Sequence, residues 1–180
     1  TVGTPVPGVE IRLAEDGEIL ARGPNVMKGY HKRPEETALM FRDGWLATGD
    51  IGAFDEAGFL RITDRKKDLF KTSGGKYIAP QPIENRLKLD PRILNAVVVG
   101  EHRKFPSALL VPAPGVSPEA LQQAVDAVNR TLAPYEQIKR FAVLEADFTL
   151  EGGELTPTMK VRRREVERHH AALIDGLYAE

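Results

Sequence analysis

The sequence predicts an α+β protein in two parts, a β-barrel-like part followed by a smaller α+β domain. Up to about residue 63, short alternating strands are separated by glycine turns. After residue 67, apolar strand segments alternate with amphipathic helical segments. The change falls inside the charged stretch DRKKDLFKTSGGKYIAP, residues 64–80, so we expect one domain over residues 1–66 and another over residues 67–180.

The first part is predicted to be rich in antiparallel strands. Residues 9–14 and 18–23 each alternate apolar and polar side chains, and a Glu-Asp-Gly turn joins them. This pattern is typical of a hairpin. A proline at the start and acids in the first turn predict a helix over residues 33–41. Two more strands, 45–54 and 59–63, flank an Asp-Glu-Ala-Gly turn. The pattern favours a small β-barrel or β-sandwich over a parallel α/β sheet.

The second part is predicted to be an antiparallel or mixed sheet with flanking helices. We expect helices over residues 80–89, 117–134 and 161–180, and strands over residues 95–100, 107–112 and 138–145. Ser117 suits the N-cap and Pro118 the first position of the middle helix. Four apolar positions of the last helix are expected to face the core: Val166, Leu173, Ile174 and Leu177.

Composition excludes several classes of protein. The 25 basic and 26 acidic residues nearly cancel, which argues against a nucleic-acid binder. No apolar run approaches the roughly 20 residues that a transmembrane helix needs. The lack of cysteine excludes disulfides, thiolate zinc sites and cysteine nucleophiles, and it fits a reducing compartment. Because the chain opens at Thr1 without a signal region, we expect it to be a piece of a longer protein.

Basic residues concentrate in two stretches, 61–76 and 160–168. Such clusters are common on solvated surfaces, but two of them in a neutral chain would suit an anionic ligand. His169 and His170 are adjacent, so they would lie on different sides of a helix and lack the spacing of metal ligands. We therefore predict no metal site.

Three segments, in this order, resemble the adenylate-forming superfamily of acyl-CoA synthetases, luciferases and peptide-synthetase adenylation domains. They are GWLATGD (44–50), DRKKDLFKTSGGKYIAPQPIE (64–84) and LTPTMKVRRREV (155–166). Within the superfamily, GGKYIAP and LTPTMKVRR look most like long-chain fatty acyl-CoA synthetases. Luciferases and adenylation domains more often carry Gly-Lys where this chain has Met159-Lys160.

The resemblance implies that residues 1–66 are the β-rich end of an N-terminal adenylating domain and residues 67–180 its mobile C-terminal domain. The family's phosphate loop, acyl pocket and magnesium-binding Thr-Glu motif are not in this sequence, so the fragment alone is expected to be inactive. The parent would convert fatty acid, ATP and CoA to acyl-CoA, AMP and pyrophosphate through acyl-AMP. It would use Mg²⁺, pair with the rest of its own N-terminal domain, and be cytoplasmic, with peripheral contact at the inner membrane face left open.

The resemblance also implies a nucleotide site. Asp50 follows Thr-Gly at a predicted strand end, where a carboxylate can accept both ribose hydroxyls; the alternative is a carboxylate that caps a turn. Arg65 matches an arginine that reaches the same ribose, and otherwise it would pair with a neighbouring aspartate on the surface. Tyr77 matches an aromatic position near the adenine that gates the acyl channel.

A hinge and a loop for the pantetheine arm of CoA are implied in the same way. Lys67 occupies the hinge position, where an exposed side chain permits large changes in φ and ψ. Ser73, Gly74 and Gly75 would line the pantetheine tunnel, because glycine lets a thin chain pass close to the backbone. The loop lacks the residues of a Walker motif. Lys76 is a candidate phosphate contact.

Lys160 is the candidate catalytic residue. A positioned ammonium would offset the repulsion between an attacking carboxylate and the α-phosphate, and a lysine on a late loop could be swung in and withdrawn. The alternative is a solvated cation at a helix start. Arg162 to Arg164 would either meet CoA phosphates or only add solubility.

Two other functions remain open on this sequence. One is another adenylate-forming ligase, which would act on aryl, amino-acid or fatty acyl substrates and use a carrier protein. The other is a non-catalytic module that only binds a partner.

Overall fold

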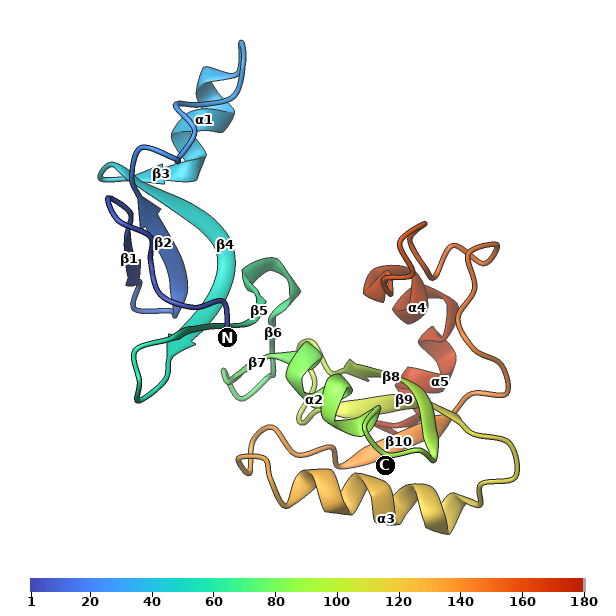
Figure 1. The fold of residues 1–180 in the computed structure, drawn as a ribbon. Coiled ribbons are helices and arrows are strands. Elements are labelled where there is room, and N and C mark those ends of the chain that lie inside the picture. Colours follow the sequence, from blue (N-terminus) through green and yellow to red (C-terminus); the bar gives the residue numbers. More distant parts are fainter. Residues whose placement is uncertain (180) are drawn as a thin grey trace. The chain divides into compact units, whose positions relative to one another are not determined.

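The computed structural model describes residues 1–179, which form two compact units, Thr1–Leu69 and the residues from Phe70 onward (Figure 1). The sequence predicts the division after residue 66. A short 3-10 helix, η1 (Lys66–Asp68), follows instead as the last element of the first unit. The Lys66 ammonium lies 2.5 Å from Asp16 Oδ2 and 2.8 Å from Glu18 Oε2, and these ion pairs hold η1 to the first sheet.

The first unit is a curled antiparallel sheet with one helix (Figure 1). Its elements are β1 (Glu10–Leu13), β2 (Glu18–Arg22), α1 (Pro34–Met40), β3 (Phe41–Arg42), β4 (Trp45–Phe54) and β5 (Leu60–Arg65). The strand order is β1-β2-β4-β3, and β5 pairs with the other part of β4. The predicted hairpin and the strand over 45–54 are confirmed. The described strands of this unit form one sheet, however, and not the two stacked sheets of a sandwich.

Strand β4 curls because its pairing is irregular. The register shifts between Ile51 and Gly52 where β4 pairs with β5, and such irregularities bend a strand. A Cβ on Gly52 would lie 2.6 Å from the Arg61 carbonyl oxygen and 2.7 Å from Ile19 Cδ1. Only glycine therefore fits this close approach.

The second unit is built on a mixed three-stranded sheet in the order β10-β9-β8. Its elements are β6 (Phe70–Lys71), β7 (Tyr77–Ile78), α2 (Pro80–Leu87), β8 (Ile93–Val99), β9 (Ser107–Pro112), α3 (Pro118–Asn129), β10 (Arg140–Val143), α4 (Arg163–His169) and α5 (Ala171–Gly176). Strands β8 and β9 are antiparallel, whereas β10 lies parallel to β9. The prediction of an α+β unit with a mixed sheet is confirmed.

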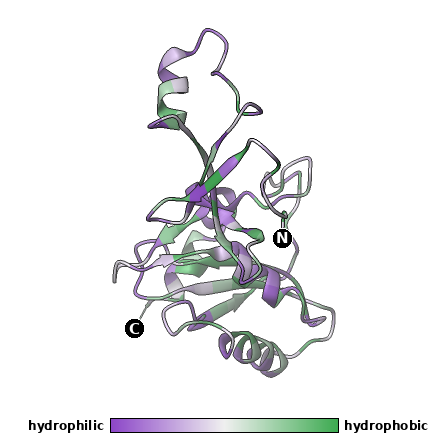
Figure 2. Cartoon of the chain, turned by 60° about the vertical axis from the view of Figure 1, so that its left-hand side comes forward, coloured by the Kyte–Doolittle hydropathy of each residue, from purple (hydrophilic) through white to green (hydrophobic). Residues whose placement is uncertain are grey.

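Both faces of this sheet are covered. Successive residues of β8 point to opposite faces, so Ala96 and Val98 join a core with α2 and α3, while Val97 and Val99 join a core with α4 and α5. Helix α3 begins as predicted, because Ser117 Oγ accepts the Ala120 N–H at 3.3 Å. Figure 2 shows hydrophilic and hydrophobic stretches alternating along α3, as expected for an amphipathic helix.

The predicted helix over residues 161–180 is wrong in one respect, because it is broken at His170. This residue has φ −105° and ψ 21°, outside helical geometry, and it separates α4 from α5. The break changes the direction in which later side chains point. Val166, Ile174 and Leu177 are buried as predicted, whereas Leu173 is 41% exposed. Residues 1–179 contain no helix with the length and apolar content needed to cross a bilayer.

Candidate functional site

The structure brings two predicted nucleotide-binding residues together. Asp50 of β4 is the cross-strand partner of Arg65 of β5, and Arg65 Nε lies 3.4 Å from Asp50 Oδ1. Asp50 lies within β4, beside the register shift, and not at the predicted strand end. Both side chains remain partly exposed. The pair can therefore present a carboxylate and a guanidinium side by side to the hydroxyls of a sugar.

Hydrogen bonds fix the backbone next to Asp50. Thr48 Oγ1 donates to the Ile19 carbonyl at 2.7 Å and accepts the Asp50 N–H at 3.2 Å. Gly49, at φ 73°, donates its N–H to Glu18 Oε1 at 3.1 Å. A positive φ is the conformation that glycine adopts without a steric penalty. Hydrogen bonds therefore hold the backbone of Thr48, Gly49 and Asp50 within β4.

Glu18 is a buried carboxylate that sequence reasoning missed. Besides the Gly49 N–H, it binds the Lys66 ammonium at 2.8 Å and the Arg42 guanidinium at 3.2 Å. Hydrogen bonds to Asp16 and Glu18 raise the pKa of Lys66, and the Lys66 ammonium lowers the pKa of Asp16. The signal was a glutamate directly before two apolar residues of a predicted strand. Glu18 thus connects the backbone of Gly49, next to Asp50, to Lys66. Lys66 directly precedes the predicted hinge residue Lys67, which is exposed.

The predicted pantetheine loop is an exposed hairpin turn between β6 and β7. Ser73, Gly74 and Gly75 are exposed, and Gly75 has φ 80°. The Thr72 N–H donates to the Lys76 carbonyl at 3.0 Å, which closes the turn. The Ser73 N–H donates to the Arg103 carbonyl at 2.8 Å, so the loop is held against the β8–β9 connection.

The two residues after the glycines both take part in cation–π contacts. Tyr77 is 62% exposed, and the Lys71 ammonium lies 5.4 Å from its ring centroid. The Lys76 ammonium lies 5.7 Å from the ring centroid of Tyr135. Tyr77 is thus an exposed ring with Lys71 beside it, and the aromatic partner of Lys76 comes from the α3–β10 connection.

Lys160 lies exposed at the end of a tight hairpin that leads into α4. Leu155 and Val161 form an antiparallel bridge at its base. The Thr156 N–H donates to the Lys160 carbonyl at 2.8 Å, and Thr156 Oγ1 accepts the Lys160 N–H at 3.0 Å. The backbone of Lys160 is therefore fixed while its ammonium is free to extend into solvent.

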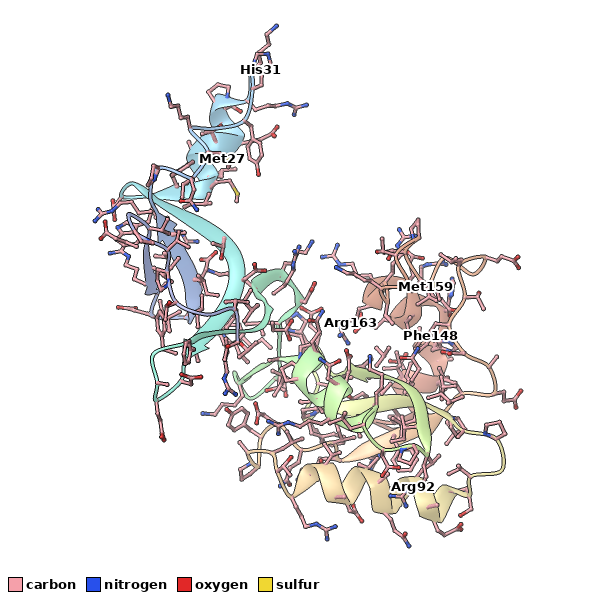
Figure 3. All side chains as sticks on the ribbon, viewed as in Figure 1. Met27, His31, Arg92, Phe148, Met159 and Arg163 are labelled. Atoms are coloured by element: carbon pink, nitrogen blue, oxygen red, sulfur yellow. The ribbon has the colours of Figure 1, made fainter. Side chains whose placement is uncertain are left out.

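Met159 has a backbone conformation that favours glycine. Its φ is 60°, in the left-handed region where a Cβ is unfavourable and glycine is preferred (Figure 3 shows Met159 on the hairpin before α4). The hairpin keeps this geometry with methionine because the Met159 N–H donates to the Thr156 carbonyl at 2.8 Å.

The arginines at 162 to 164 do not act as one cluster. Arg163 forms an ion pair of 2.7 Å with Glu84 of α2, and its side chain is only 20% exposed. It also donates to the Val98 carbonyl, while Glu84 Oε1 accepts the Val98 N–H at 2.7 Å. Arg162 and Arg164 are exposed. Arg163 joins α4 to α2 and β8 (Figure 3), a structural role that neither expectation included.

A basic cavity of about 510 Å³ lies in the second unit, and sequence reasoning missed it. It is lined by Ser73, His102, Arg103, Lys104, Phe105, Arg140, Tyr178 and Ala179. The guanidinium carbon of Arg103 lies 5.0 Å from the Tyr178 ring centroid, and that of Arg140 lies 5.9 Å from the Phe105 ring centroid. Burial raises the pKa of the Tyr178 phenol. Cations beside aromatic rings suit an anionic ligand that carries a ring.

His169 and His170 do not point to different sides as predicted. Because the helix breaks at His170, both imidazoles approach the Glu154 carboxylate, at 3.2 Å and 3.4 Å. Among residues 1–179, no group of three or more histidine, aspartate or glutamate side chains is arranged to hold a metal ion.

Comparisons with known proteins agree with the three motifs. Residues 67–180 match the family described as AMP-binding enzyme C-terminal domain. Over 99% of its length the chain is 41% identical to the long-chain-fatty-acid–CoA ligase FadD15 of Mycobacterium tuberculosis, and over 98% it is 36% identical to the mouse long-chain-fatty-acid–CoA ligase 5. It covers 34% and 31% of these relatives, so it spans about a third of their length.

A solved structure shares the fold. The didomain of carboxylic acid reductase from Segniliparus rugosus in complex with AMP is similar over 98% of this chain and 28% of its own, with a TM-score of 0.79 and 26% identity. The chain therefore belongs to the AMP-binding enzyme C-terminal domain family of the adenylate-forming superfamily, and its relatives include long-chain fatty-acid–CoA ligases.

Proposed function

We propose that this chain is the C-terminal part of an ATP-dependent long-chain fatty acyl-CoA synthetase. The observation that carries the proposal is Lys160, an exposed ammonium on a hydrogen-bonded hairpin within the LTPTMKVRR motif. The similarity to long-chain fatty-acid–CoA ligases over nearly the whole chain supports the same activity. The complete synthetase, with its phosphate loop and acyl pocket, would carry out the reaction.

In the first half-reaction, a fatty acid carboxylate attacks the α-phosphorus of ATP, and the bond to the β-phosphate breaks to release pyrophosphate. Both reactants are anionic, so a cation near the bridging oxygens lowers the barrier. Lys160 supplies that cation. Asp50 accepts the ribose hydroxyls, Arg65 donates to the same sugar, and the exposed ring of Tyr77 contacts the adenine. Mg²⁺ would neutralise the phosphates and would be held by residues outside this chain.

In the second half-reaction, the CoA thiol attacks the acyl-AMP carbonyl and AMP leaves. The loop of Ser73, Gly74 and Gly75 would contact the pantetheine arm. Ser73 also lines the basic cavity, so the arm and the phosphorylated nucleotide of CoA can be bound next to each other within the second unit. Arg103, which is paired with Asp175, and Arg140, which donates to the Leu177 carbonyl, would meet the CoA phosphates from the wall of this cavity. Rotation of the second unit about Lys67 would replace the arrangement that serves acyl-AMP formation by the one that serves thioester formation.

The rest of the N-terminal domain is the proposed partner of the first unit. Helix α1 buries none of its seven described residues, and Leu39 on it is 79% exposed. The missing part of the N-terminal domain, which the longer relatives contain, would cover this exposed leucine. We propose a cytoplasmic location for the complete enzyme.

The experiment is Lys160→Ala in the complete synthetase, with the two half-reactions measured separately. Acyl-AMP formation should fall about 10²–10³-fold, as when one preorganised donor to a developing anion is lost. Thioester formation from supplied acyl-AMP should be nearly unchanged. Lys88→Ala, at another exposed lysine, is the matched control and should change neither half-reaction. Unchanged acyl-AMP formation in Lys160→Ala would reject the catalytic assignment.

The same assay separates the two rival functions. A ligase that uses a carrier protein would form acyl-AMP but would not form a thioester with CoA. A module that only binds a partner would support no ATP–pyrophosphate exchange in the complete protein.

A further inference from the structure

Glu154 is a nearly buried carboxylate that the proposed chemistry does not use. Its side chain is 11% exposed, and Oε1 lies 3.2 Å from His169 Nδ1 and 3.4 Å from His170 Nε2. Its other oxygen, Oε2, accepts the Thr149 N–H at 3.2 Å. We call Glu154 with these two histidines the Glu154 clamp. A buried charge with three partners holds its surroundings in one arrangement.

The geometry assigns the proton of His169. Arg168 Nη2 lies 2.6 Å from His169 Nε2, and a guanidinium can only donate, so Nε2 accepts. The proton of the neutral ring is therefore on Nδ1, which donates to Glu154. Arg168 itself is held by Glu165 at 2.9 Å. The clamp thus extends as a continuous polar network from Glu154 into α4.

Glu154 is also the first residue of the hairpin that carries Lys160. The Glu154 carbonyl accepts the Arg162 N–H at 2.7 Å, directly below the bridge between Leu155 and Val161. The next rung is the bond between the Thr156 N–H and the Lys160 carbonyl. The side chain of Glu154 therefore joins the base of this hairpin to the junction of α4 and α5.

We propose that Glu154 is a positioning residue that fixes the direction in which the hairpin presents the Lys160 ammonium. The proposal rests on the adenylation role of Lys160 proposed above. A small displacement of a catalytic group, about 1 Å, can lower a rate on the order of 10²-fold. With the clamp removed, the hairpin would still be attached by the buried Leu155, but it could tilt about that residue. Loss of the clamp therefore misplaces Lys160 without unfolding the unit.

The first test is Glu154→Ala in the complete synthetase. We expect kcat for acyl-AMP formation to fall about 10–10²-fold, with KM for ATP changed less than about threefold. Thioester formation from supplied acyl-AMP should stay within about twofold, because Lys160 takes no part in it. Equal losses in both half-reactions would show a general structural role and overturn the proposal.

A conservative pair of substitutions tests the hydrogen bonds themselves. The variant His169→Asn with His170→Gln keeps an N–H donor near each original nitrogen, whereas His169→Leu with His170→Leu removes both donors. Adenylation should be largely retained in the first variant and reduced as in Glu154→Ala in the second. Equal activity of the two variants would overturn the proposal.

A double-variant cycle distinguishes this proposal from the proposed function. If Glu154 acts only through Lys160, adding Glu154→Ala to Lys160→Ala should cause no further loss of adenylation. An additive loss would overturn the positioning role while leaving Lys160 catalytic. If Lys160→Ala alone leaves adenylation intact, the proposed function of Lys160 is wrong and the positioning role is rejected with it.

Discussion

The two units of this chain differ in how much core each one holds. In the described residues, the first unit has one small buried cluster, made of Leu20, Trp45 and Ala47. The second unit has a core on each face of its sheet, in which 14 and 11 buried residues take part. Hydrophobic burial is the main favourable term in folding, so we expect the second unit to be the more stable of the two when each is isolated.

Two arginine ion pairs, one from each unit, differ in their exposure. In the first unit, the Arg65–Asp50 pair lies at a partly exposed surface, although the same unit also holds the buried Glu18 with its partners Lys66 and Arg42. In the second unit, the Arg163–Glu84 pair lies between helices and a strand, and it holds their packing. The comparison teaches that arginines from two basic motifs can differ in burial, and that the buried one holds the packing of its own unit.

The largest expected effect comes from separating the units. Residues 70–180 expressed alone should fold and melt in one cooperative transition, whereas residues 1–69 alone should be largely unfolded because their core is too small. Circular dichroism melts of the two pieces would check this. A cooperative melt for residues 1–69 would contradict the comparison.

The next effect concerns the buried ion pair of the second unit. Arg163→Ala should lower the free energy of unfolding by about 3–5 kcal/mol, because Glu84 is left buried without its cation. Arg164→Ala, at an exposed neighbour, is the control and should change it by less than about 0.5 kcal/mol. Chemical denaturation of the two variants measures the difference. Equal changes in the free energy of unfolding for the two variants would show that Arg163 is only a surface cation.

A smaller effect of opposite sign is expected at Met159. Met159→Gly should raise the free energy of unfolding of the second unit by up to about 1 kcal/mol, because glycine adopts φ 60° without the Cβ penalty. Thr158→Gly, at the preceding exposed position, lacks this relief and should be neutral or destabilising. Destabilisation by Met159→Gly would mean that methionine contacts outweigh the strain.

The smallest effect concerns acid stability after α2. Hydrogen bonds from Arg92 lower the pKa of Asp90 to about 2, against an ordinary value of 3.8. The resulting stability is therefore present above about pH 4 and is lost as the pH falls through about 2. Because the pair is partly solvated, Asp90→Asn should cost under about 1 kcal/mol at pH 7 and nothing below pH 2. Unfolding measured at pH 7 and at low pH would test both statements.

The sequence by itself determined most of the local structure. Alternation of apolar and polar residues predicted the first hairpin and the strands of the second sheet, because strand periodicity is a local property. Ser117 and Pro118 predicted the start of α3 through their own hydrogen bond and fixed φ. The placement of Lys160 on an exposed loop before a helix is also confirmed.

Tertiary structure decided what depends on residues far apart in the chain. Glu84 and Arg163 lie on two helices far apart in the sequence, so no local pattern predicts their ion pair. The pair gives Arg163, a residue of the third motif, a structural role. The basic cavity forms only when the connection after β8 meets Arg140 and Tyr178.

The break at His170 shows the same limit within one segment. The last 20 residues have the apolar pattern of a single helix, yet the backbone at His170 divides this segment into α4 and α5. That division turns two adjacent histidines toward Glu154. The direction of each side chain depends on its position around the helix axis. A break in the helix changes that direction for the residues that follow, and the apolar pattern of this segment did not predict the break.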